Sequence, residues 1–161
     1  RMIEGGEDVS FIARRMVIFA SEDIGNANPN ALLLANSTFQ SVNVIGYPES
    51  RIILSQCAIY LAASPKSNAS YAAIGDAQDL VRKTGDLPIP LHLRNAATSL
   101  MKKMDYGKDY RYVHSFDNNF ILQEYLPAEL SGHVFYSPQH NTREEEMRKF
   151  LKERWGKKYG Y

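Results

Sequence analysis

Two strongly apolar stretches joined by only about three residues constrain the fold of this chain more than any other feature. The dipeptide Asn28-Pro29 is typical of a helix start, because a capping side chain precedes proline, and it predicts a helix to about Ile45. A second apolar helix is expected to open at Tyr47-Pro48-Glu49 and to end at Pro65. So short a connection forces the two helices into an antiparallel hairpin.

Both helices of this hairpin are apolar over wide arcs. The runs Ala31–Ala35 and Ala58–Ala63 leave little polar face, which is typical of helices that are buried on more than one side. In a domain of this size, part of that burial is expected to come from a second subunit. The hairpin therefore predicts an oligomer interface, and its candidate residues are Leu33, Phe39, Ile52, Ile59 and Tyr60.

Further helices are predicted on both sides of the hairpin. Asp8 is expected to cap the first, which Gly25 ends. Another is expected from about Ala69 to Lys83, behind a cap at Ser67 or Asn68.

The middle of the chain has a different character. Pro88 and Pro90 predict that the stretch Asp86–Arg94 is extended. A short helix is expected over Asn95–Met104, and Val134–Tyr136 is a candidate strand that pairs with Ile89–Leu93.

The chain is expected to end in a helix. Thr142, with Glu145 three residues later, forms a capping box that opens a helix to about Trp155. The fold class is therefore predicted as all-α, with extended tyrosine-rich loops and at most one short β-hairpin. We expect one domain over 1–161, organised as a four-helix part (1–85), a loop-rich part (86–141) and the terminal helix (142–155).

The composition of the chain excludes several classes to which the protein could belong. The chain has 161 residues, of which 44% are hydrophobic and 23% charged, and this is typical of a folded globular domain. Its net charge of +1 does not indicate a bulk polyanion partner. No apolar run approaches a membrane span and no signal peptide is present, so the sequence predicts no membrane partner. A single cysteine fits a reduced, cytoplasmic compartment.

The chain opens with Arg1, which is not an initiator residue, and we expect it to be a fragment of a longer protein.

Motifs for catalysis are scarce. No Gly-x-x-x-x-Gly-Lys-Ser/Thr phosphate loop occurs, and no two histidines share a helix face at metal-ligand spacing. Cys57 lies in an apolar helix, where core packing is favoured over nucleophilic catalysis. Glu22 and Asp23 form a carboxylate pair that is more typical of a solvated or capping site than of acid–base chemistry. A hydrolase is thus the least favoured class, and no catalytic, cofactor-binding or metal-binding residue is assigned.

Basic residues interleave with tyrosines in the middle of the chain. Single-stranded nucleic acids bind to such surfaces, although tyrosines in a loop more often anchor the loop to the core. The candidate contacts to DNA or to another partner are Lys66, Arg94, Lys102, Lys103 and Arg111. The terminal helix carries acids first and bases later, which the helix dipole alone explains.

Several ordered segments carry a family resemblance. They are Met2–Asp8, Phe11–Arg15, Ala20–Gly25, Ile59–Ala62, Pro65–Asn68, Leu87–Asn95, Tyr106-Gly107, Tyr110–Tyr112, His114, Tyr125–Pro127 and Phe135–Pro138. Together they resemble the C-terminal region of the replication-associated recombination protein A family, also called MgsA, to which the eukaryotic Werner-helicase-interacting ATPase is related. The resemblance covers about Met2 to Trp155. It departs at Asn118-Asn119 and Leu122, where the family often has a glutamine pair.

The resemblance implies more than the composition does. Full-length members are AAA+ ATPases related to clamp loaders, and they bind ATP and Mg²⁺ through motifs upstream of the segment seen here. This chain would be a helical domain like the clamp-loader collar, without catalysis of its own, that drives homotetramer formation. The implied partners are a second copy of the chain, single-stranded or gapped DNA, and single-stranded-DNA-binding protein. The implied location is the cytoplasm, in association with the nucleoid.

Overall fold

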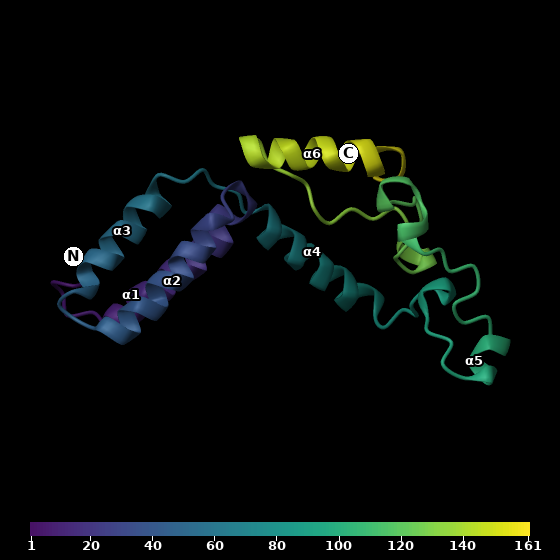
Figure 1. The fold of residues 1–161 in the computed structure, drawn as a ribbon, viewed down its shortest axis with the longest axis horizontal. Helices are drawn as coiled ribbons and strands as arrows, with labels where there is room; N and C mark the ends of the chain where they lie inside the picture. The colour runs from purple at the N-terminus through teal and green to yellow at the C-terminus, as the bar shows by residue number, and fades with distance from the viewer. The chain divides into compact units, whose positions relative to one another are not determined.

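The computed structural model describes all of residues 1–161, and it is helical with no β-strand (Figure 1). The predicted all-α class is confirmed. The helices are α1 (Val9–Phe19), α2 (Asn30–Ile45), α3 (Ser50–Ala62), α4 (Ala69–Thr84), α5 (Ser99–Lys103) and α6 (Thr142–Tyr159). A π-helical turn over Ala20–Ile24 follows α1, and five short 3₁₀ turns occupy parts of the connections.

The chain divides into two compact units, each with its own packing. Unit 1 comprises Arg1–Asp76 and Phe135–Met147, and unit 2 comprises Ala77–Val134 and Arg148–Tyr161. The divisions fall inside α4 and α6, so each unit is built from two separate stretches of sequence.

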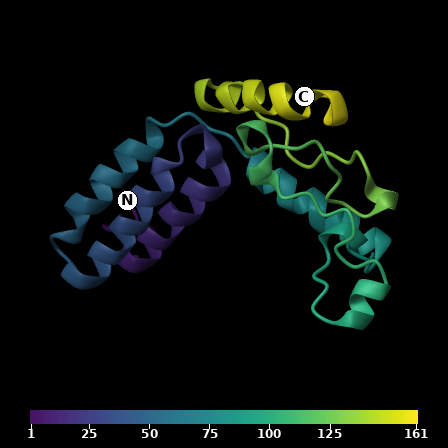
Figure 2. The same cartoon turned by 45° about the vertical axis from the view of Figure 1, so that its right-hand side comes forward.

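The core of unit 1 is a bundle of α1, α2 and α3, which lie side by side (Figures 1 and 2). The predicted hairpin is present, because residues 46–49 turn the chain from α2 back along it into α3. Small residues on the inner faces let the helices approach closely. The fully or nearly fully buried positions are Ala13, Ala20, Ile24, Ala31, Ala35, Val42, Leu54, Cys57 and Leu61.

Side-chain hydrogen bonds fasten the start of α2 to the end of α3. The prediction that Asn28 caps α2 is wrong, since no side chain caps that helix. Instead the Asn28 amide donates to the hydroxyl of Tyr60 at 3.1 Å and to that of Ser64 at 3.0 Å. The cap predicted at Asp8 is confirmed, because its carboxylate accepts from the N–H of Phe11 at 2.8 Å.

Gly25 ends the π-helical turn at a place where no other residue fits. Its φ of +49° lies in the left-handed region, and an added Cβ would lie 2.7 Å from the carbonyl oxygen of Ser67. Gly75, in the middle of α4, differs in both respects, because its φ is ordinary and an added Cβ would meet nothing within 4 Å.

The same substitution at these two glycines is therefore expected to have opposite effects. Gly25→Ala should lower the free energy of unfolding by about 2 kcal/mol, through backbone strain and a clash with backbone. Gly75→Ala should raise it by about 0.5–1 kcal/mol, because alanine is the better helix former. Urea denaturation of both variants measures this, and two effects of equal sign would contradict it.

Unit 2 is held together by aromatic rings rather than by a row of aliphatic side chains. Trp155 of α6 packs edge-on against Phe120, with ring centroids 4.8 Å apart, and also contacts Tyr125 and Tyr159. Pairs of this kind stabilise a core beyond the area that they bury. The indole thus joins the last helix to the loop-rich part of the chain.

Three sequence expectations outside the hairpin need correction. The strand pairing of Val134–Tyr136 with Ile89–Leu93 is wrong, because Pro88 and Pro90 supply no N–H groups and residues 91–93 form a 3₁₀ turn. The short helix covers only Ser99–Lys103, since Thr98 caps it by accepting from the N–H of Met101.

The third correction concerns α6. Its cap is Asn141 rather than Thr142, because the Asn141 side chain accepts from the N–H of Glu144 at 3.0 Å. The helix continues to Tyr159, one turn beyond the predicted end at Trp155. That last turn carries Lys158, which forms an ion pair with Glu124 at 3.0 Å.

Candidate functional site

The α2–α3 hairpin leaves large apolar side chains facing solvent. On α2, Leu33 is 70% exposed and Val44 is 86% exposed; they lie three turns apart and so share one side of the helix. On α3, Ile52 is 63% and Ile59 68% exposed, and they lie two turns apart. On each helix these two side chains begin and end an outward row whose middle positions are exposed polar residues, Ser37 and Gln40 on α2 and Ser55 and Gln56 on α3.

The other two predicted interface residues face inward. Phe39 packs against the buried cluster that contains Ile12, Val42 and Leu54. Tyr60 packs beside Cys57 and Leu61, and its hydroxyl is engaged by Asn28. Both side chains are half-buried in their own chain, so neither belongs to the outward rows.

Of the five predicted cationic contacts, Lys66 belongs to unit 1 and the other four to unit 2. Lys66 lies over the ring of Phe19, 5.1 Å from its centroid. Arg94 is used inside unit 2, where it donates to the carbonyl of Ile89 and to the hydroxyl of Tyr106. The remaining candidates, Lys102, Lys103 and Arg111, are exposed.

The tyrosines of the middle loop serve two purposes. Tyr106 anchors the loop, since Arg94 binds its hydroxyl and lies over its ring. Gly107, at φ +70°, brings its N–H to the carbonyl of Leu91 at 2.9 Å and fixes the turn. Tyr110 and Tyr112 are 56% and 57% exposed. The loop thus leaves two aromatic rings more than half exposed, one of which, Tyr112, also contacts the ring of His114.

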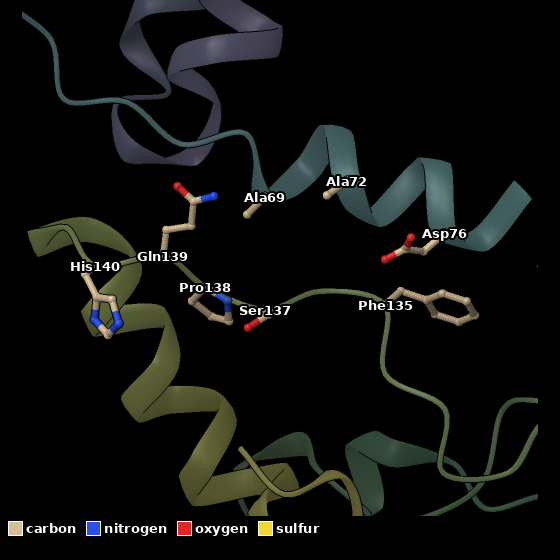
Figure 3. A pocket seen from close by; sticks show the side chains of 8 residues that line it. All are labelled: Ala69, Ala72, Asp76, Phe135, Ser137, Pro138, Gln139 and His140. Carbon is tan, nitrogen blue, oxygen red and sulfur yellow. The ribbon is translucent and has the colours of Figure 1, made fainter. Parts of the chain in front are cut away.

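A groove of about 630 Å³ lies in unit 1 between α4 and the extended stretch Phe135–His140 (Figure 3). Ala69 and Ala72 form the helical wall, and Asp76 and His140 lie at its opposite ends. No hydrogen bond joins Asp76 to His140. The groove therefore brings together no acid–base pair.

A buried carboxylate fixes the wall of this groove. Glu144 is fully buried, and its carboxylate accepts from the Tyr136 hydroxyl at 2.8 Å and from the Asn141 amide. Burial opposes its ionisation, but hydrogen bonds from Ser67, Asn141, Tyr136 and the N–H of Gln139 outweigh this and lower the pKa of Glu144. The contact is structural, because every oxygen faces a donor of the chain itself.

Unit 2 has a comparable anchor in Glu124. Burial again opposes ionisation, but hydrogen bonds from Ser131, two backbone N–H groups and Lys158 lower the pKa of Glu124 to about 2. The Tyr159 hydroxyl also lies 3.3 Å from this carboxylate, and its own pKa is raised, mainly by burial. The carboxylate thus holds the end of α6 in place.

The groups that the sequence offers for catalysis are one buried thiol and two exposed carboxylates. Cys57 is fully buried, and burial raises the pKa of its thiol, so the thiolate is disfavoured. Glu22 and Asp23 are exposed on the π-helical turn. No three His, Cys, Asp or Glu side chains gather where they could hold a metal ion. No helix has both the length and the hydropathy to cross a membrane.

Charge is divided unequally between the units, a feature that the net charge of +1 hides. Unit 1 has ten Asp and Glu against six Lys and Arg, whereas unit 2 has thirteen Lys and Arg against eight acids. Within unit 2, residues 77–134 are balanced at seven of each, and residues 148–161 carry six bases against one acid. The basic excess therefore lies on α6, and not around the predicted contacts Lys102, Lys103 and Arg111.

Comparisons with known proteins point in one direction. The family model "MgsA AAA+ ATPase C terminal" matches residues 1–155. An uncharacterized protein of Thermotoga maritima is 46% identical over 160 residues, which is 99% of this chain and 26% of that protein. Replication-associated recombination protein A of Coxiella burnetii is 47% identical over 139 residues, 86% of this chain and 32% of that protein. ATPase WRNIP1 of Dictyostelium discoideum is 42% identical over 137 residues, 84% of this chain and 16% of that protein.

Proposed function

Because this chain belongs to the MgsA AAA+ ATPase C-terminal family, we propose that it is the part through which a larger ATPase assembles into a homotetramer. The chain spans 26% of the Thermotoga maritima relative and 32% of the Coxiella burnetii relative, so the proposal assigns nucleotide chemistry to the remainder of such a protein. In this proposal ATP and Mg²⁺ bind outside the present chain. The assembled ATPase acts in replication and recombination, as the names of the relatives suggest.

The exposed aliphatic side chains of the outward rows on α2 and α3 carry this proposal. Single exposed aliphatic residues are ordinary, but two on each of two neighbouring helices of one hairpin support an association surface. A closed tetramer built from two-fold contacts needs two different interfaces, and the hairpin offers two separate rows.

The test is the solution mass of the 161-residue chain, measured by light scattering over a concentration series. The mass of four chains, 18.3 kDa each, is the expected result. A monomer at every concentration would overturn the proposal for this chain.

A second candidate function is contact with single-stranded DNA through the middle loop. It is supported by Tyr110 and Tyr112, whose exposed rings stand next to Arg111 and in the same unit as Lys102 and Lys103. Bases stack on such rings while cations hold the phosphates. Since the surrounding segment is balanced in charge, stacking must supply most of the affinity.

We expect Tyr110→Ala and Tyr112→Ala each to weaken binding of a labelled oligothymidine by about tenfold, as the loss of one stacked base would. The affinity should fall with salt at a log–log slope of about −2, as three phosphate contacts on a single strand predict. Tyr47→Ala, which removes a ring from unit 1 that is 61% exposed, is the matched control. Equal losses for all three variants, or no binding at low salt, would contradict this candidate.

A further inference from the structure

The largest unexplained features of the chain are the acidic excess of unit 1 and the basic excess on α6. The dipole of α6 accounts for bases in its last turn, but Lys152 and Lys149 lie about two and three turns before its end. Neither lysine forms an ion pair within the chain. The carboxylates of Glu22 and Asp23 likewise have no partner in unit 1. Unpaired charges of opposite sign thus lie on two parts of one chain.

Unit 1, which has the acidic excess, contains a mostly apolar groove of about 430 Å³. We call it the Glu22 groove. It is formed where the end of α1, the start of α2 and the start of α4 meet. Glu22 stands on its rim, and the lining residues that leave apolar surface exposed are Leu32, Tyr71 and Ile74. The π-helical turn places Glu22 there, and such turns recur at functional sites.

The basic part of α6 also carries an exposed apolar side chain, which is complementary to the apolar groove. Phe150 of α6 is 53% exposed, and the guanidinium of Arg154 lies 4.5 Å from its ring centroid. Lys149 precedes it in the sequence and Lys152 follows within one turn, and both are exposed. An aromatic ring among cations is the complement of an apolar groove with a carboxylate on its rim.

We propose that the basic half of α6 in one copy of this chain docks into the Glu22 groove of a second copy. Phe150 enters the groove, and Lys149 faces the carboxylate of Glu22. This inference rests on the proposed self-association and adds a second, electrostatic contact to the outward rows of the hairpin. In a two-fold pair each copy gives one α6 and one groove, so the contact occurs twice.

A nucleic acid is the competing occupant of α6, but the observations favour a second copy. A polyanion would account for the lysines, yet it leaves the groove and its carboxylates without a role. The second copy accounts for both sides at once. It also explains how a chain of net charge +1 contains units of such different charge.

A reciprocal charge exchange tests the contact, with the association of the whole chain measured by sedimentation. Glu22→Lys and Lys149→Glu should each raise the dissociation constant about tenfold. The double variant Glu22→Lys with Lys149→Glu should restore most of the lost affinity, because the two charges are exchanged. Phe150→Ala should also raise the dissociation constant about tenfold. Rising salt should weaken association of the unaltered chain and leave the doubly neutralised variant, Glu22→Gln with Lys149→Gln, less affected. Glu4→Lys and Lys83→Glu change charge elsewhere and are the matched controls. All positions but Phe150 carry exposed polar side chains, so circular dichroism should show unchanged folding.

The outcomes separate this contact from the proposed function. If the chain forms oligomers that none of the three single substitutions weakens, the α6 contact is overturned and assembly through the hairpin stands. Failure of the double variant to recover also overturns the pairing. If Lys149→Glu abolishes binding of a labelled oligothymidine and leaves association unchanged, α6 is a nucleic-acid surface and the proposal is wrong. A chain that is monomeric at every concentration overturns both.

Discussion

Leu33→Asp and Ile59→Asp are each expected to lower the solution mass of the chain to that of a dimer or less, and the double variant to that of a monomer. A carboxylate in the centre of an apolar contact must lose its water without gaining a partner, and this weakens association about a hundredfold or more. The fold should survive, because Leu33 is 70% and Ile59 68% exposed, and substitutions at such positions change stability little.

The control for these variants is Val81→Asp. Val81 is 61% exposed and apolar, but it lies on α4 rather than on the hairpin, so its replacement should leave the mass unchanged. Light scattering and circular dichroism of all four variants decide the matter. Single variants that stay folded and tetrameric would show that the outward rows are not the interface.

The second large effect is expected at Glu144. Replacing it by alanine removes a buried carboxylate and leaves the donors of Ser67, Tyr136 and Asn141 without an acceptor. The free energy of unfolding should fall by about 3 kcal/mol, as it does when one partner of a buried charged network is deleted. Glu146→Ala, two residues further along α6 and on the surface, removes only a 3.8 Å pair with Arg143 and should have no measurable effect.

Glu144 also makes stability depend on pH in one direction. Because its folded-state pKa lies below the ordinary value of 4.5, its contribution is complete above that value. The contribution is lost as the pH falls through the lowered pKa of the folded state. Glu144→Gln should remove this part of the acid dependence, so urea denaturation of both proteins from pH 7 downward should show a difference that shrinks in acid. A constant difference would contradict this role.

The sequence was sufficient to predict the helical scaffold of unit 1. Pro29 at the start of α2, Gly46 after its end and the short connection to α3 predict the hairpin, because these signals act through the local backbone. The cap at Asp8 and the burial of Cys57 follow from equally local patterns. The cap of α6 was less secure, because Asn141 and Thr142 are adjacent and either satisfies the same rule. The cap predicted at Asn28 failed for another reason, since its side chain binds Tyr60 and Ser64 of a distant segment.

Other features depend on contacts that a single sequence does not reveal. Glu144 reads as one of three exposed glutamates in a row, and only the fold brings Ser67 and Tyr136 to it. The inward packing of Phe39 and Tyr60 was missed because a helix that is apolar all round does not show which side faces its own core. The charge division could have been found by counting charges for each segment, and the count would have drawn attention to α6.

The division of unit 1 into two stretches has a consequence for the order in which the chain can fold. The three-helix bundle is complete once residue 64 has been made, and its contacts are local enough to form early during synthesis. Glu144, which ties the second stretch to Ser67, is synthesised only after the whole of residues 77–134. A truncated chain that stops before residue 135 would therefore keep the bundle, but the segment before α4 would lack the hydrogen bond between Ser67 and Glu144.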